Sequence, residues 1–199
     1  GYLFWSQNLI DEEELELFIP GLSIQALGRA QVKRHGKAVS APEFTNQRTV
    51  RELFFFLRVH PDGLRKRAIG QALWPESSPE ELKRQFKNAV YRLRRALGKE
   101  VVIYDQSEKR YRFNWGLDYR YDVEDFRTQL SRAHNAESDQ EQTAALESAI
   151  SFYRHPYLPR VTQLWVEPIR NRLFRRFKDA VLTLAELYLD FKEYENSIH

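Results

Sequence analysis

The chain has 199 residues, 42% hydrophobic and 14% aromatic, so it carries enough apolar material for a core, and simple disorder is excluded. It contains no cysteine, which excludes disulfides, thiolate metal sites and cysteine nucleophiles. No apolar run reaches the roughly 18 residues of a membrane span, and residues 1–20 hold no base, unlike a signal peptide. We therefore expect a cytoplasmic protein that does not contact membranes. Because Met is also absent, we expect a piece excised from a longer protein.

The net charge of +3 is an average over three unlike segments. Residues 1–20 form an acidic lead-in with five acids and no base, whereas residues 21–115 hold 20 Lys/Arg against 9 Asp/Glu. Residues 116–199 are mildly acidic, with 11 Lys/Arg against 14 Asp/Glu. A basic module between acidic neighbours favours a polyanion partner, although a basic surface can also serve solubility alone.

Residues 22–39 alternate weakly between apolar and polar positions, which predicts short antiparallel strands with a hairpin near Gly36. From Thr45, a plausible N-cap, the apolar spacing becomes helical, and this helix should end before Pro61. A short second helix is expected to end at Trp74.

The third helix has the clearest signals. Ser78 followed by Pro79 and Glu81 is typical of a capping box, and Gly98 is typical of a helix end. The apolar stripe is expected to contain Leu82, Phe86, Ala89, Val90, Leu93 and Leu97. Residues 101–113 then read as a β-hairpin with a polar tip.

Strand signals end at Gly116, and the rest of the chain is predicted to be helical. Ser138 with Glu141 should cap the second of these helices, and residues 155–159 should interrupt them. A turn into a further helix is expected at residues 192–194. The long helix before it should bury Ile169, Leu173, Phe174, Phe177, Ala180, Val181, Leu184 and Tyr188. Paired helices of this length resemble tetratricopeptide repeats, although the repeat consensus is not met.

Two short helices, a basic third helix and a hairpin have the order of a winged helix-turn-helix. Between Leu82 and Leu97 there are six bases and no acid, whereas an ordinary solvated face mixes both signs. Arg can bind guanine and Asn adenine in the major groove, and both Lys and Arg hold phosphates. The predicted recognition residues are Lys83, Arg84, Lys87, Asn88, Tyr91, Arg92, Arg94 and Arg95.

Two further basic groups are expected to contact the DNA backbone. Lys109, Arg110 and Arg112 belong to the wing, although a hairpin tip needs solvated polar residues in any case. Arg65, Lys66 and Arg67 open the second helix and could hold a phosphate.

These residues resemble a known family. Ala72-Leu73-Trp74-Pro75 and the run Tyr91–Gly98 resemble the OmpR-like winged-helix domain of SARP-type transcriptional regulators. The run Tyr121–Phe126 and Trp165-Val166-Glu167-Pro168 resemble the bacterial transcriptional activator domain that follows in that family.

The resemblance implies an α+β winged helix in residues 21–115, followed by an all-α, tetratricopeptide-like domain in residues 116–199 that is cut short. It also implies promoter DNA binding at repeats, by a homodimer or by protomers in tandem. RNA polymerase contact is implied for the loop that holds Glu76, Ser77 and Ser78. Arg84 and Asn88 depart from common family residues, so base preference does not carry over.

Rival functions are weaker. The five histidines are scattered and no catalytic, metal or nucleotide motif is present, so we expect no catalytic residue, no metal and no cofactor. RNA is a poorer fit to a groove-reading helix than B-form DNA. The remaining alternative is a protein–protein interaction scaffold of helical repeats with only non-specific nucleic-acid affinity.

Overall fold

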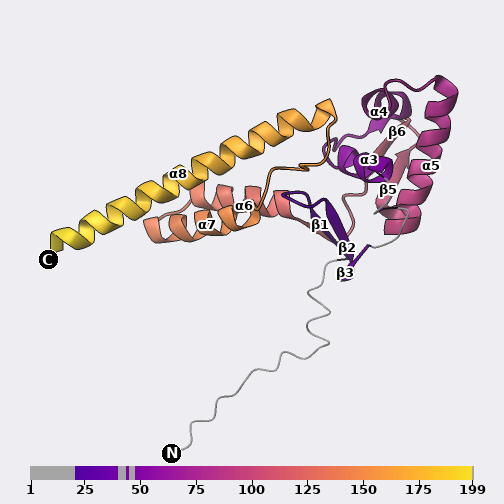
Figure 1. Cartoon of the computed structure of the whole chain (residues 1–199). Helices are drawn as coiled ribbons and strands as arrows, with labels where there is room; N and C mark the ends of the chain where they lie inside the picture. Colours follow the sequence, from indigo (N-terminus) through magenta and orange to yellow (C-terminus); the bar gives the residue numbers. More distant parts are fainter. Residues whose placement is uncertain (1–20, 40–43, 45–47, 199) are drawn as a thin grey trace, which may run out of the picture.

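The computed structural model describes residues 21–39, residue 44 and residues 48–198, with the backbone alone for residues 192–198. The acidic lead-in and the Thr45 N-cap lie outside these residues. The described chain is mixed α+β: two small sheets and three helices lie at one end of the molecule, and a helical arm extends from them (Figure 1).

The first sheet has the strand order β3-β2-β1-β7. The strands are β1 (Leu22–Gln25), β2 (Gln31–Arg34), β3 (Lys37–Ala38) and β7 (Tyr119–Tyr121). The predicted hairpin is confirmed, because β2 and β3 pair antiparallel across His35 and Gly36, both with positive φ. The expectation of helices alone after Gly116 is wrong: β7 pairs in parallel with β1 and completes the sheet.

Three helices follow in the winged-helix order: α3 (Arg48–Arg58), α4 (Lys66–Leu73) and α5 (Pro79–Leu97). The predicted ends before Pro61 and at Trp74 are confirmed. Helix α4 packs closely on α5 at Gly70, where an added Cβ would lie 2.2 Å from Cδ1 of Leu82. This close approach requires glycine, and it explains why Leu82 is half-buried above α4.

The second sheet has the order β4-β6-β5 and forms the wing. Its strands are β4 (Leu64–Arg65), β5 (Val102–Asp105) and β6 (Arg110–Phe113), and the short 3-10 helix η1 (Lys99–Val101) leads into β5. The predicted hairpin over residues 101–113 is confirmed. Arg65, assigned to the start of the second helix, instead lies in β4 opposite Arg110.

The helical arm consists of α6 (Asp122–His134), α7 (Asp139–Phe152), the 3-10 helix η2 (Leu164–Val166) and α8 (Glu167–Ile198). The Ser138 cap is confirmed, since its Oγ accepts a hydrogen bond from the Glu141 backbone N–H at 3.2 Å. The predicted turn at residues 192–194 is wrong, because α8 continues through them.

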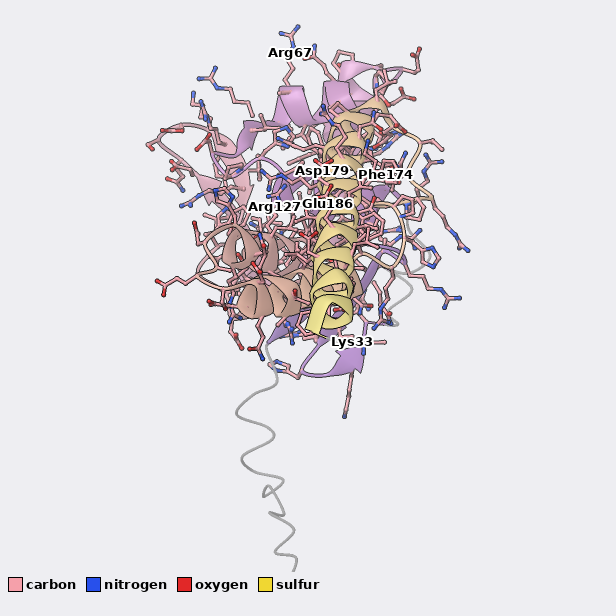
Figure 2. The ribbon with its side chains drawn as sticks, turned by 90° about the vertical axis from the view of Figure 1, so that its left-hand side faces the viewer. Lys33, Arg67, Arg127, Phe174, Asp179 and Glu186 are labelled. Carbon is pink, nitrogen blue, oxygen red and sulfur yellow. The ribbon has the colours of Figure 1, made fainter. Side chains whose placement is uncertain are left out.

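The predicted inner face of α8 is only partly correct. Ile169, Leu173 and Ala180 are buried, but Phe174 is 51% exposed, Val181 38% and Tyr188 50%. Figure 2 shows Phe174 on one side of α8 and Asp179 on the other. The buried side faces α7, and the apolar spacing extends beyond what one neighbouring helix can cover.

One hydrophobic core crosses the predicted boundary between residues 115 and 116. It joins residues of the first sheet and α3, such as Ile24 and Phe54, to Phe126 and Leu173 of the arm. A second, smaller cluster of Ala133, Ala145, Leu146 and Ala180 lies further along the arm. The two-domain division therefore stays a prediction, and packing is continuous across it. Among the described residues, no helix is long and apolar enough to span a membrane.

Asp122, the first residue of α6, fastens the arm to the first sheet. Its carboxylate accepts hydrogen bonds from the backbone N–H of Ala26, at 2.9 and 3.0 Å, and of Leu27, at 2.8 Å. Burial raises the pKa of Asp122 to about 6, against the opposing effect of these hydrogen bonds. The folded protein is thus less stable with Asp122 ionised than with Asp122 protonated.

We expect the stability of this joint to fall as pH rises. A folded-state pKa of about 6 lies above the unfolded value of 3.8, so the contribution is complete below pH ~4 and is lost through pH ~6. Its size is about 2–3 kcal/mol. Urea unfolding at pH 4 and pH 7 measures this effect. The free energy of unfolding of Asp122→Asn, relative to that of the parent, should rise by this amount from pH 4 to pH 7. A pH-independent difference would contradict the prediction.

Candidate nucleic-acid interface

Helix α5 begins at a complete capping box. The Ser78 side chain accepts from the Glu81 backbone N–H at 3.4 Å, and the Glu81 carboxylate accepts from the Ser78 backbone N–H at 3.0 Å. Hydrogen bonds that the Ser78 backbone N–H and the Ser78 hydroxyl donate to the Glu81 carboxylate lower the pKa of this carboxyl. The cap therefore fixes where the helix starts.

The buried face of α5 contains Phe86, Ala89, Val90, Leu93 and Leu97, as predicted apart from half-buried Leu82. Six of the eight predicted recognition residues are exposed: Lys83, Arg84, Lys87, Asn88, Tyr91 and Arg95. Tyr91 is 62% exposed, which is high for an aromatic side chain. Arg92 and Arg94 are half-buried at the edges of this face.

Arg94 holds the fold together rather than projecting outward. One of its terminal nitrogens, Nη2, donates to the Val102 backbone carbonyl at 2.8 Å, which ties α5 to β5 of the wing. Its Nε is buried and has no hydrogen-bond partner among the residues that the structure describes. Because this guanidinium is engaged with the protein's own backbone, it is the least suited of the eight to read a base.

A groove of about 960 Å³ runs along α5. Its α5 wall includes Lys83, Lys87 and Tyr91, and its other side includes Lys66 and Tyr111. Tyr111 also packs edge-on against Phe86, with ring centroids 4.6 Å apart, and so positions the wing beside α5.

Arg34 from β2 and Lys99 line the groove as well. Sequence reasoning missed both, since nothing in their local pattern sets them apart from other surface cations.

The three wing cations have different surroundings. Lys109 is exposed at the turn, with φ of 56°, whereas Arg110 pairs with Glu108 at 3.2 Å and donates to the Asp62 carbonyl at 3.4 Å. Arg112 is half-buried along β6. Lys109 is therefore the wing cation best placed to meet a partner.

The basic side chains around the start of α4 are divided between two positions. Lys66 lines the α5 groove, and Arg65 and Arg67 are exposed. In Figure 2, Arg67 and Lys33 lie at opposite ends of the molecule, Arg67 on α4 and Lys33 on the first sheet. Arg67 is thus separate from the first sheet and lies at the end that carries α4.

The loop between α4 and α5 contains Glu76, Ser77 and Ser78. Glu76 is exposed, but the Ser77 hydroxyl donates to Gln85 Oε1 at 3.2 Å and Ser78 caps α5. Of the three predicted polymerase-contact residues, Glu76 alone makes no hydrogen bond or ion pair with the described part of the chain.

No metal-binding cluster of three or more His, Asp or Glu side chains occurs within the described ranges. His60, one of the scattered histidines, has its Nδ1 2.7 Å from the Phe56 carbonyl, an interaction that caps the end of α3.

The fold and this face define a class: an α+β protein with a winged helix-turn-helix and a helical arm. No protein-family model matches the chain, and no curated protein does. Among solved structures it is similar to Mycobacterium tuberculosis EmbR, solved in complex with a low-affinity phosphopeptide, with a TM-score of 0.70 and 22% identity. The match covers 85% of this chain and 46% of the EmbR chain, so this chain spans under half of that protein's length. At this identity the likeness concerns the fold.

Proposed function

We propose that the protein is a sequence-specific regulator of transcription that binds double-stranded DNA through α5 and the wing. The observation that carries this proposal is the exposed, acid-free face of α5. Lys83, Arg84 and Lys87 project from it beside Asn88, and the described helix has no acid after its first turn. A helix of this diameter fits the major groove, where Arg and Asn can read base edges.

The position of the wing also supports the proposal that α5 enters the major groove. Phe86 and Tyr111 hold β6 beside α5, so the exposed Lys109 lies on the wing that flanks the helix. A wing beside a recognition helix can contact phosphates while the helix reads bases. Binding of this kind predicts strong salt dependence, because every neutralised phosphate releases counterions.

The fold shared with EmbR and the motif resemblance to SARP-type regulators support the finer proposal of a SARP-type activator. In that proposal, α6, α7 and α8 are a tetratricopeptide-like activator domain that supports a homodimer or tandem protomers on promoter repeats. The close packing of α6 against α7 is compatible with such a repeat.

The proposal is tested by selecting bound DNA from random sequence at 50 and 200 mM salt. If about six to ten phosphates are neutralised, affinity for the selected site should fall about 10³–10⁵-fold between these concentrations. An interaction scaffold would yield no consensus. That alternative has one observation in its favour, the exposed apolar residues Phe174, Leu182 and Leu189 on α8.

For the polymerase contact, Glu76→Ala is the informative change. Glu76 is exposed and does not cap α5, so we expect lower transcription in a reconstituted assay with unchanged DNA affinity. Ser78→Ala is a poor substitute, since losing an N-cap costs about 1 kcal/mol of stability. A parallel loss of transcription and DNA affinity in Glu76→Ala would contradict the contact.

A further inference from the structure

A second basic cavity lies away from α5, where the first sheet, α3 and the loop before η2 meet. It has a volume of about 690 Å³, within the range of small-molecule sites. We call it the junction pocket. Its polar lining includes Arg29, Arg48, Glu52 and Arg160, and its apolar lining includes Phe55 and Leu158.

The loop that carries Arg160 is held firmly in place. The Leu158 backbone N–H donates to the Ala26 carbonyl at 2.8 Å, and Tyr157 bridges to Leu27. From α8, the Arg170 guanidinium donates to the carbonyls of Tyr157, Leu158 and Val161 at 3.0, 2.7 and 3.1 Å. These contacts hold the loop in place before any ligand binds.

Cations dominate the polar lining. Glu52 is the one acid among the lining residues, and it is already engaged: it accepts from Arg48 Nε at 2.6 Å and from Gln163 Nε2 at 2.9 Å. Within the part of the chain that the structure describes, neither Arg29 nor Arg160 has a hydrogen-bond or ion-pair partner, and both are exposed. Two arginines from segments far apart in sequence therefore line one cavity, and neither is paired with a carboxylate of the described residues.

The remaining lining is apolar. Phe55 and Leu158 are buried and form its floor, with Val161 beside them. An apolar floor under a few convergent polar groups is the usual composition of a small-molecule site. Guanidinium groups match phosphate oxygens in geometry and bind them by paired, charge-assisted hydrogen bonds.

We propose that the junction pocket binds a small molecule with two or more adjacent phosphates, held by Arg29 and Arg160 with its organic part over Phe55. This goes beyond DNA binding and does not depend on it. Because α3 packs against α5 and the loop belongs to the arm, a ligand here would contact both parts of the molecule.

Calorimetric titration of the full chain with sodium tripolyphosphate, at constant ionic strength, tests the proposal. Removing two charge-assisted contacts should weaken binding about 10-fold or more in Arg29→Ala/Arg160→Ala. The matched control is Arg132→Ala/Arg176→Ala, which removes the same charge from exposed positions outside the pocket. A third variant, Lys83→Ala/Lys87→Ala, reports binding in the α5 groove.

We expect the control variant to bind like the parent, and Lys83→Ala/Lys87→Ala to weaken binding less than Arg29→Ala/Arg160→Ala does. Equal weakening in the junction and control variants would mean that only net charge matters, and would overturn the proposal. A larger loss in Lys83→Ala/Lys87→Ala would place the probe on α5, and absence of binding to the parent would equally overturn it. Should the double variant unfold, Arg29→Gln and Arg160→Gln singly, each expected to weaken binding, replace it.

Discussion

Replacing Arg58 with alanine should lower the free energy of unfolding by about 3–5 kcal/mol, the largest stability effect that we expect from one substitution. Arg58 ends α3 with a side chain that is 0% exposed. Its guanidinium carbon lies 4.4–4.5 Å from the ring centroids of four aromatic residues, Phe113, Trp115, Tyr119 and Tyr121. Truncation would remove these contacts and leave a cavity inside the aromatic box.

The ion pair of Arg58 contributes less than the aromatic box. Arg58 Nη2 lies 2.7 Å from Glu124 Oε1, but the Glu124 side chain is 41% exposed, so solvent screens the attraction. We therefore expect Glu124→Gln to cost about 1 kcal/mol or less. Cation–π contacts without solvent are each worth up to about 2 kcal/mol, although four around one cation do not add.

Arg58→Met separates packing from charge. Methionine refills most of the box, so the difference between the Met and Ala variants measures packing, and the loss that remains measures the cation. Urea unfolding of the three variants, with exposed Arg67→Ala as the control, provides these values. A loss below about 1 kcal/mol for Arg58→Ala would contradict the prediction.

The aromatic box shows what sequence patterns leave out. Helices α3, α4, α5, α6 and α7 could be predicted because apolar spacing, caps and prolines are local signals. Arg58 has no such signal: at the end of an apolar helix it resembles an ordinary C-terminal cation. Its surroundings depend on residues 113–121, which are distant in sequence and approach only after folding.

Dependence on residues distant in sequence also explains two wrong predictions, the missing strand β7 and the buried face of α8. Strand β7 has three residues, too few for alternation to be visible, and exists because β1 offers it a parallel edge. On α8, Phe174 and Tyr188 have the spacing of core residues, but burial depends on the presence of a neighbouring helix. The α5 face was predictable as a set of positions, whereas the engagement of Arg94 with Val102 and the convergence of Arg29 and Arg160 required the tertiary structure.

The second large effect concerns DNA sequence preference. Arg84→Ala/Asn88→Ala should reduce discrimination between the selected site and its variants by about 1–3 kcal/mol for each lost base contact, a loss of tenfold or more. Both side chains are exposed and neither has a structural hydrogen bond within the described residues, so the helix should persist without them.

Lys109→Ala is the counterpart, because an exposed wing cation that touches phosphate carries no sequence information. It should weaken binding to all sequences alike and reduce the salt dependence by about one phosphate. Exposed Arg132→Ala, on α6, controls for net charge. Competition binding with selected and scrambled DNA at two salt concentrations distinguishes these effects. If Arg84→Ala/Asn88→Ala keeps parental preference, α5 does not read the bases; if Arg132→Ala weakens binding as much as Lys109→Ala, the wing makes no specific phosphate contact.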